Sequence, residues 1–254
     1  MVRPCEPPPG IAKLSGALKR HGVEYDIIDA NLEGLLFLCQ RALAARDTWT
    51  RRAVVRVDLN LEALMLPSTY RNLDRYKQAV YELNRVLHLQ DRSGSTTVSL
   101  ANYQDRNLSP VKSGDLIQAF ESPEKNSFCP YFEKRLSAAM EDDRPRLVGF
   151  SLNFLSQALC TFAMIGALRR LDPTIRIILG GGLITSWMRR PGWRNPFEGF
   201  IDGLVAGEGE AALLSILDME YTAGADISDF NNFLPLPYLS PGFILPYSAS
   251  IGCY

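Results

Sequence analysis

Strands that end in glycine and alternate with long helices occupy residues 146–217, and this pattern limits the fold more than any other feature. A strand is predicted over residues 146–152, "RLVGFSL", a nearly all-apolar helix over 153–173, and a second strand over 174–182, "TIRIILGGG". Residues 200–217, "FIDGLVAGEGEAALLSIL", then predict a strand, a turn and a helix. Because helices of this length serve as crossover connections, we expect a parallel sheet that is covered on both faces.

The amino-terminal residues repeat this alternation. Apolar and small residues at helical spacing predict a helix that begins near Ile11 and stops at Gly22. The run "VEYDIID", residues 23–29, predicts a buried strand, and a second helix is expected over about residues 32–46. The fold class that follows is α/β, a doubly wound parallel sheet of the Rossmann or flavodoxin type.

Three parts of the chain are expected from this pattern. Residues 1–46 and 146–220 form the α/β domain, residues 47–145 form a mainly helical insertion folded onto it, and residues 221–254 form a linker. The insertion lacks the glycine-ended strands, so we expect it to supply no binding loops. Its predicted elements are helices over 59–66, 70–89 and 132–140 and a strand or half hairpin over 95–103.

Loops at the carboxyl ends of the strands hold the candidate binding residues, because ligands of doubly wound sheets bind there. The candidates are Gly10, Ser151, Asn153, Gly180, Gly181, Gly182, Gly207, Glu208 and Gly209. Glycine exposes bare backbone to a bulky ligand, and the two small polar side chains would point into the crevice. Each candidate also has a purely structural explanation: a rigid proline-rich turn before the first helix, helix caps at the polar residues, and tight turns at the glycines.

The turn "VAGEGEAALL" is the most regular of these loops. Gly207 and Gly209 flank Glu208, and Glu210 falls in the first turn of the following helix, where exposed N–H groups and the helix dipole stabilise a carboxylate. By itself this is an ordinary strand-to-helix turn. Its place after a third strand makes the set of loops more informative than any single one.

The order of five segments carries a family resemblance. "PPPGIAKLSGALKRHGVEYDIIDAN", "LVGFSLNF", "IILGGG", "VAGEGEAALLSIL" and "LPYSASIGCY" together resemble the amino-terminal half of radical S-adenosylmethionine enzymes that carry a cobalamin-binding domain. The resemblance covers nearly the whole chain except the insertion. It implies a B12-binding-like domain that is closed by the glycine-glutamate turn and followed by a radical domain of the same chain.

Cys253 gains a role only through this resemblance. In the family, the radical domain opens with C-x-x-x-C-x-x-C, and Cys253 resembles the first of the three thiolates that hold a [4Fe–4S] cluster. The open iron of that cluster would bind S-adenosylmethionine. The other two thiolates would lie beyond Tyr254, so the cluster and S-adenosylmethionine are expected in the full-length protein and not in this chain alone.

The resemblance implies cobalamin bound without a histidine from the protein. Methionine synthase-like domains supply the cobalt ligand from D-x-H-x-x-G, whereas this stretch is "CEPPPG", with Pro7 where the histidine would stand. Proline has no free lone pair for a metal. His21, at the end of the first helix, and His88, in the insertion, are both expected to be structural.

Composition excludes several other classes of function. Lys+Arg 27 against Asp+Glu 28 leaves a net charge of -1. The chain therefore has no overall excess of positive charge with which to bind nucleic acid or an anionic membrane. Five scattered cysteines without a C-x-x-C pair favour a reducing cytoplasm, and polar residues interrupt the longest apolar stretch. The chain has no nucleophile elbow, H-E-x-x-H or Walker loop, and the pairs Arg51-Arg52 and Arg189-Arg190 are interpreted as solvated faces.

Two functions are compatible with these features of the sequence. As a cofactor module, the domain would present cobalamin to a radical active site for methyl transfer or rearrangement at an unactivated carbon; the glycine-ended strands favour this. As a docking or substrate-binding module, it would keep the fold without cobalamin; the proline-rich first loop favours this. A third, a signalling domain with Asp29 as phosphoacceptor, is disfavoured by the terminal linker and cysteine. The sequence leaves the substrate open.

Overall fold

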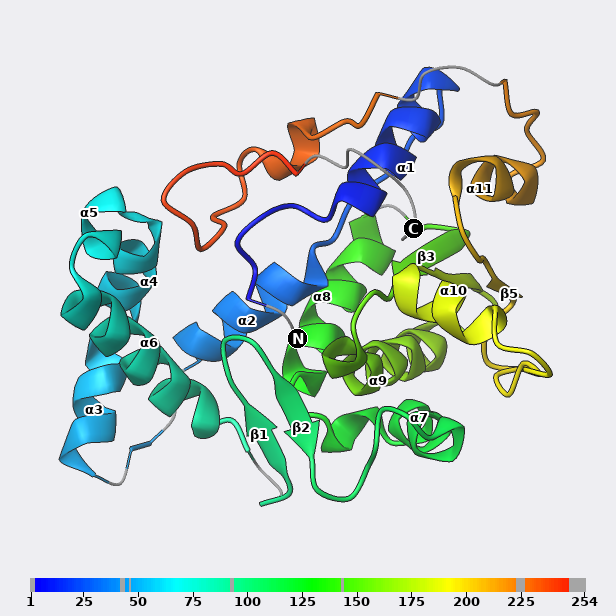
Figure 1. The fold of residues 1–254 in the computed structure, drawn as a ribbon. Helices are drawn as coiled ribbons and strands as arrows, with labels where there is room; N and C mark the ends of the chain where they lie inside the picture. The colour runs from blue at the N-terminus through cyan, green and yellow to red at the C-terminus, as the bar shows by residue number, and fades with distance from the viewer. Residues whose placement is uncertain are drawn as a thin grey trace.

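The protein was analysed as a computed structural model, which describes residues 3–41, 44–45, 47–91, 94–142, 144–222 and 227–246 (Figure 1). Within these ranges the chain is an α/β protein, as predicted, with a parallel sheet, a separate small hairpin and many helices. The helices of the first half of the insertion gather at one side of the molecule, and the parallel sheet lies at the other (Figure 1).

The parallel sheet is built from the three predicted strands of the carboxyl-terminal half. Its strands are β3 (Leu147–Ser151), β4 (Arg176–Gly180) and β5 (Gly203–Leu204), and they lie in that order with all pairs parallel. Helices α9 (Leu155–Leu171) and α10 (Gly182–Met188) make the two crossovers. In β4, Ile177, Ile178 and Leu179 are all buried, as expected of a central strand.

Helix α9 is the centre of the hydrophobic core. It packs against α7 (Ser113–Glu121), against α8 (Cys129–Asp142) and against the short helix η1 (Pro123–Lys125) that lies between them. Gly166 of α9 contacts the backbone of Phe120, so that a side chain at this position would meet the main chain of the neighbouring segment. The close approach of α7 therefore depends on this glycine.

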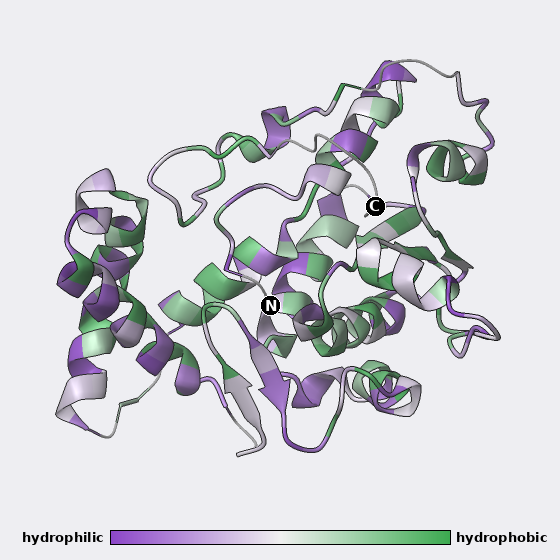
Figure 2. Ribbon diagram, viewed as in Figure 1, coloured by the Kyte–Doolittle hydropathy of each residue, from purple (hydrophilic) through white to green (hydrophobic). Residues whose placement is uncertain are grey.

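The insertion shares one hydrophobic core with α9 and the sheet. Its first helices form a layer of amphipathic elements in which hydrophilic and hydrophobic residues alternate along each helix (Figure 2). Strands β1 and β2 pair as an antiparallel hairpin, in agreement with the prediction for residues 95–103. The elements are α3 (Thr48–Val55), α4 (Val57–Met65), α5 (Pro67–Tyr70), α6 (Leu73–His88), β1 (Thr96–Val98) and β2 (Tyr103–Asp105).

The amino-terminal helices form as predicted, but the strand between them does not. Helix α1 (Pro9–Arg20) occupies the expected position, whereas α2 (Ala30–Gln40) begins near the expected residue and ends at Gln40, before the predicted end near residue 46. Residues 23–29 form no strand, so this prediction was wrong. Asp29 instead begins α2 by accepting a hydrogen bond from the Leu32 N–H at 3.0 Å, and Ile27 packs into a small second cluster around Ala12 and Phe233. These local contacts replace the pairing that a strand would need.

Residues 227–240, which we call the strap, lie along α1 and return to the amino terminus (Figure 1). The Asp229 N–H donates to the Ala12 carbonyl oxygen at 2.8 Å, and the Leu239 N–H donates to that of Pro4 at 2.9 Å. Within the strap, η2 (Asn231–Phe233) places Phe233 in the second cluster. This part of the predicted linker is therefore packed on the domain.

Candidate functional site

The β3 and β4 turns are joined by a polar brace. The Asn153 side-chain oxygen accepts a hydrogen bond from the Gly182 N–H at 2.9 Å, and its amide nitrogen donates to the Ser151 hydroxyl at 3.1 Å. Asn153 thus binds the neighbouring turn rather than capping α9, whose first residue is Leu155. Three of the predicted site residues, from two strand ends, meet at this edge.

Gly181 is required by the fold itself. Its φ of 105° lies in the region that favours glycine, and a Cβ there would lie 2.5 Å from the Leu152 carbonyl oxygen. At Gly180 an added Cβ would lie 3.4 Å from the Val205 carbonyl oxygen, an ordinary contact. At Gly182 the nearest atom would be the Asn153 side-chain oxygen, at 3.5 Å. Gly180 and Gly182 therefore leave room for a side chain, and Gly182 is the exposed one of the two.

Thr185 joins the β4 turn to the β5 turn. Its hydroxyl donates to the Gly181 carbonyl oxygen at 2.9 Å and accepts from the Gly207 N–H at 2.9 Å. Gly207 itself has a φ of 80°. The sequence analysis did not identify Thr185, because α10 is a single short helix with no periodic pattern. The only signal was a hydroxyl residue four positions after a glycine turn.

The glycine-glutamate turn is fixed against α1. The Lys13 ammonium lies 2.6 Å from a carboxylate oxygen of Glu210 and 3.4 Å from one of Glu208. The hydrogen bond to Glu210, which is nearly buried at the start of α11 (Glu210–Ile216), raises the pKa of Lys13. A Cβ at Gly209 would lie 3.2 Å from a methyl carbon of Leu14, so this glycine also serves close packing.

Gly10 stands apart from the other predicted residues. It is exposed in the first turn of α1, and an added Cβ there would have no neighbour within 4 Å. Within the described part of the chain, no hydrogen bond joins Gly10 to the β3 or β4 turn. Of the residues expected to converge on one crevice, Ser151, Asn153 and Gly182 are joined by hydrogen bonds, and Gly10 takes no part in these bonds.

Two exposed apolar residues lie beside the brace. Phe154 and Leu155 directly follow Asn153, and 52% and 42% of their surfaces are exposed. Large apolar side chains exposed next to bare backbone are the kind of surface that binding sites use. In this stretch of the sequence only Ser151 and Asn153 were predicted to belong to the site. The signal that was missed was an aromatic residue at the solvent-facing start of an otherwise buried helix.

The histidines offer no ligand to this edge. The Nδ1 of His21 lies 2.8 Å from the Ala17 carbonyl oxygen, its Nε2 accepts from the Thr222 N–H at 3.4 Å, and its ring stacks on Tyr221. His88 ends α6 in the insertion. Across the part of the chain that the structure describes, no group of three or more His, Cys, Asp or Glu residues could hold a metal. Cys253 lies outside the described residues.

Asp29 connects the second helix to the strap. The Tyr238 hydroxyl donates to its carboxylate at 2.7 Å, and both groups are buried. Burial raises the pKa of Asp29 despite the hydrogen bonds from Tyr238 and the backbone. Arg3 reinforces the same region by donating to the Leu239 carbonyl oxygen at 2.9 Å and to the Tyr76 hydroxyl at 2.7 Å. Asp29 therefore has a structural partner.

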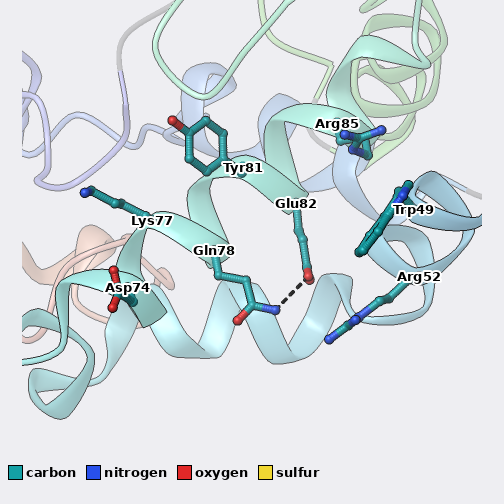
Figure 3. A pocket seen from close by; sticks show the side chains of 8 residues that line it. All are labelled: Trp49, Arg52, Asp74, Lys77, Gln78, Tyr81, Glu82 and Arg85. Atoms are coloured by element: carbon teal, nitrogen blue, oxygen red, sulfur yellow. Dashed lines mark hydrogen bonds between the residues drawn. The ribbon is translucent and has the colours of Figure 1, made fainter.

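A hollow of the described surface lies elsewhere, on the insertion. It measures about 390 Å³ and runs between α3 and α6 on the insertion. Figure 3 shows the hydrogen bond between the Gln78 and Glu82 side chains, with Tyr81 on the opposite side of α6; Glu82 also accepts a hydrogen bond from the Asn60 side chain of α4 at 2.7 Å. The hollow is lined by Trp49, Arg52, Asp74, Lys77, Gln78, Tyr81, Glu82 and Arg85. Its charged side chains are of both signs, and none of its lining residues comes from the sheet edge.

Comparison with models of known protein families, with curated proteins and with solved structures finds no match for this chain. The candidate site therefore stands on its geometry and on the order of its sequence segments. Among the described helices, none combines the length and the apolar character that crossing a membrane requires.

Proposed function

We propose that this chain is the amino-terminal, B12-binding-like domain of a cobalamin-dependent radical S-adenosylmethionine enzyme. Its sheet would then belong to a doubly wound fold of the type that this family has. The observation that carries the proposal is the carboxyl edge of the sheet. There the Asn153 brace holds the β3 turn and the glycine turn of β4 together beside the exposed side chains of Phe154 and Leu155.

A corrin ring matches this kind of surface. It is broad and flat, so it needs an edge without protruding side chains, which Gly182 and its neighbours supply. Its faces are apolar and suit Phe154 and Leu155, while its peripheral amides suit the hydroxyl of Ser151 and the amide of Asn153. When bound, cobalamin supplies the chemistry of methyl transfer or rearrangement at an unactivated carbon; the chain's residues bind and orient it.

The proposed binding mode leaves cobalt without a protein imidazole. Pro7 is buried at the position where related domains carry the ligand histidine, and both ring nitrogens of His21 are engaged in hydrogen bonds. The residues therefore fit a cobalamin held through its ring and tail. The proposal extends to Cys253 as the first thiolate of a [4Fe–4S] cluster in a following radical domain, and there it rests on the sequence resemblance alone.

A specific observation supports a second candidate, a docking or substrate-binding module that does not bind cobalamin. Gly181 and Gly209 are bare because the chain's own atoms, at Leu152 and Leu14, occupy the space where side chains would be. Glycines of this kind are expected in the fold whether or not it binds a cofactor. Either candidate suits the reducing cytoplasm, since Cys5, Cys39, Cys129 and Cys160 are free thiols.

Titration with hydroxocobalamin, followed by absorbance and calorimetry, separates the two candidates. Gly182→Phe places a large side chain at the exposed position of the β4 turn, and we expect it to abolish binding without unfolding the chain. Gly114→Phe is the control, because Gly114 is also exposed, with no neighbour within 4 Å of an added Cβ, but lies in α7 of the insertion. Equal binding by both variants would show that cobalamin does not bind at the sheet edge. A folded wild-type chain that binds no cobalamin would leave the docking or substrate-binding module as the remaining candidate.

A further inference from the structure

The side chain of Arg189 lies over the backbone of the β5 turn. Arg189 follows α10 directly, and its N–H donates to the Thr185 carbonyl oxygen at 3.1 Å. One terminal guanidinium nitrogen lies 3.8 Å from the position that a Cβ of Gly207 would occupy. The cation is thus placed beside the bare glycine backbone that follows β5.

Within the described ranges, no hydrogen bond or ion pair engages the guanidinium of Arg189, which is exposed. The nearby acids are engaged with another cation, since Lys13 contacts both Glu208 and Glu210. Thr185, one turn earlier on α10, ties the same helix to the Gly181 and Gly207 backbones. Arg189 is therefore an available cation on an element that is fixed to two of the three sheet-edge turns.

We propose that Arg189 binds the phosphodiester of the cobalamin nucleotide tail. This inference rests on the proposed function and adds the residue that distinguishes a complete cobalamin from its bare corrin. The phosphodiester is the one anionic group at the periphery of cobalamin, because the side chains of the ring are neutral amides. Guanidinium groups recognise phosphate through two parallel charge-assisted hydrogen bonds. From the sequence, Arg189 and Arg190 were both interpreted as part of a solvated face. In the structure only Arg189 lies beside Gly207.

The test compares two ligands that differ in the nucleotide tail, including its phosphodiester. Hydroxocobalamin carries the phosphodiester, whereas cobinamide has the same corrin ring without the phosphate and nucleotide. We expect Arg189→Ala to weaken hydroxocobalamin binding about tenfold, the effect of losing a charged hydrogen bond, and to leave cobinamide binding unchanged. Arg189→Lys keeps the charge but loses the paired geometry, so its loss should be smaller. Arg190→Ala, the matched control on an adjacent exposed residue, should bind both ligands as the wild type does.

The outcomes are distinguishable from a failure of the proposed function. If the wild-type chain binds hydroxocobalamin and Arg189→Ala binds it equally well, the phosphate role is wrong while the cofactor module stands. An equal loss for cobalamin and cobinamide also overturns it, because the defect would then lie in the ring site. A wild-type chain that binds neither ligand removes the proposed function and this inference together.

Discussion

Among the single residues of the sheet edge, the glycines differ in what the missing side chain permits. At Gly181 it permits a φ of 105° and close contact with the Leu152 backbone, so the fold itself needs glycine. At Gly10 an added side chain would have no neighbour within 4 Å, and at Gly182 it would make only an ordinary contact with Asn153, so the fold does not require glycine at either position. The sequence places all three at strand or helix ends, but it carries no information on which neighbours they face, because those neighbours come from other turns.

Gly181→Ala tests this distinction. Strained backbone at positive φ costs about 1–3 kcal/mol, and the overlap with Leu152 adds to it, so we expect the free energy of unfolding to fall by at least that amount. Gly10→Ala should change it by less than about 0.5 kcal/mol, since α1 is helical there and the site is open. Urea denaturation of the two variants measures the difference, and equal stabilities would show that the Leu152 contact does not constrain the turn.

At the scale of elements, β5 is held in the sheet by α9. Arg169, near the end of α9, donates to the Asp202 carboxylate at 2.7 Å and to the Phe200 carbonyl oxygen at 3.2 Å. Asp202 also accepts from the Ile177 N–H of β4 at 2.7 Å. Burial opposes ionisation of Asp202, but these hydrogen bonds outweigh it and hold the pKa below its ordinary value of 3.8.

The stability of this connection should depend on pH. A carboxyl group with a lowered pKa in the folded state stabilises the protein above its ordinary value of 3.8, and this stabilisation is lost as pH falls through the folded value. Because Asp202 is partly exposed, we expect Asp202→Asn to cost about 0.5–1 kcal/mol at pH 7. The difference from wild type should shrink as the pH falls below 3.8, and urea denaturation across pH 3–7 measures it. A difference that stays constant over this range would contradict the ionic role.

Other elements show where prediction from the sequence succeeds and where it stops. The long, nearly all-apolar helix α9 and the strand β4 were predicted because each contains a run of consecutive buried residues, whereas the residues of β3 are partly buried or exposed and were predicted from their apolar character. Residues 23–29 have equally good strand residues, yet a strand needs a paired edge, and the sequence does not show whether one is available. The strap was not predicted to pack because its anchor, Tyr238 on Asp29, joins residues 209 positions apart.

For the whole molecule, the parallel sheet explains why part of the site could be predicted. Parallel strands end at the same edge, so Ser151, Asn153 and Gly182 were expected to lie near one another, and hydrogen bonds join them. Phe154, Thr185 and Arg189 were not predicted, because their roles depend on how α9 and α10 begin and end. The pattern of residue types in the sequence predicts where the edge of the sheet lies. Which side chains face that edge depends on how the helices pack, and the sequence pattern does not show this.

Titration of the folded chain with hydroxocobalamin, in wild-type form and as His21→Ala and His88→Ala, tests the central claim most directly. We expect all three proteins to bind with the same affinity and to give the same bound absorbance spectrum, because His21 is engaged with Ala17 and Thr222 and His88 lies on the insertion. Circular dichroism establishes that each protein is folded. Absence of binding at high micromolar cobalamin by the folded wild type would contradict the cofactor module. A bound spectrum that changes in either variant would contradict the absence of a protein imidazole on cobalt.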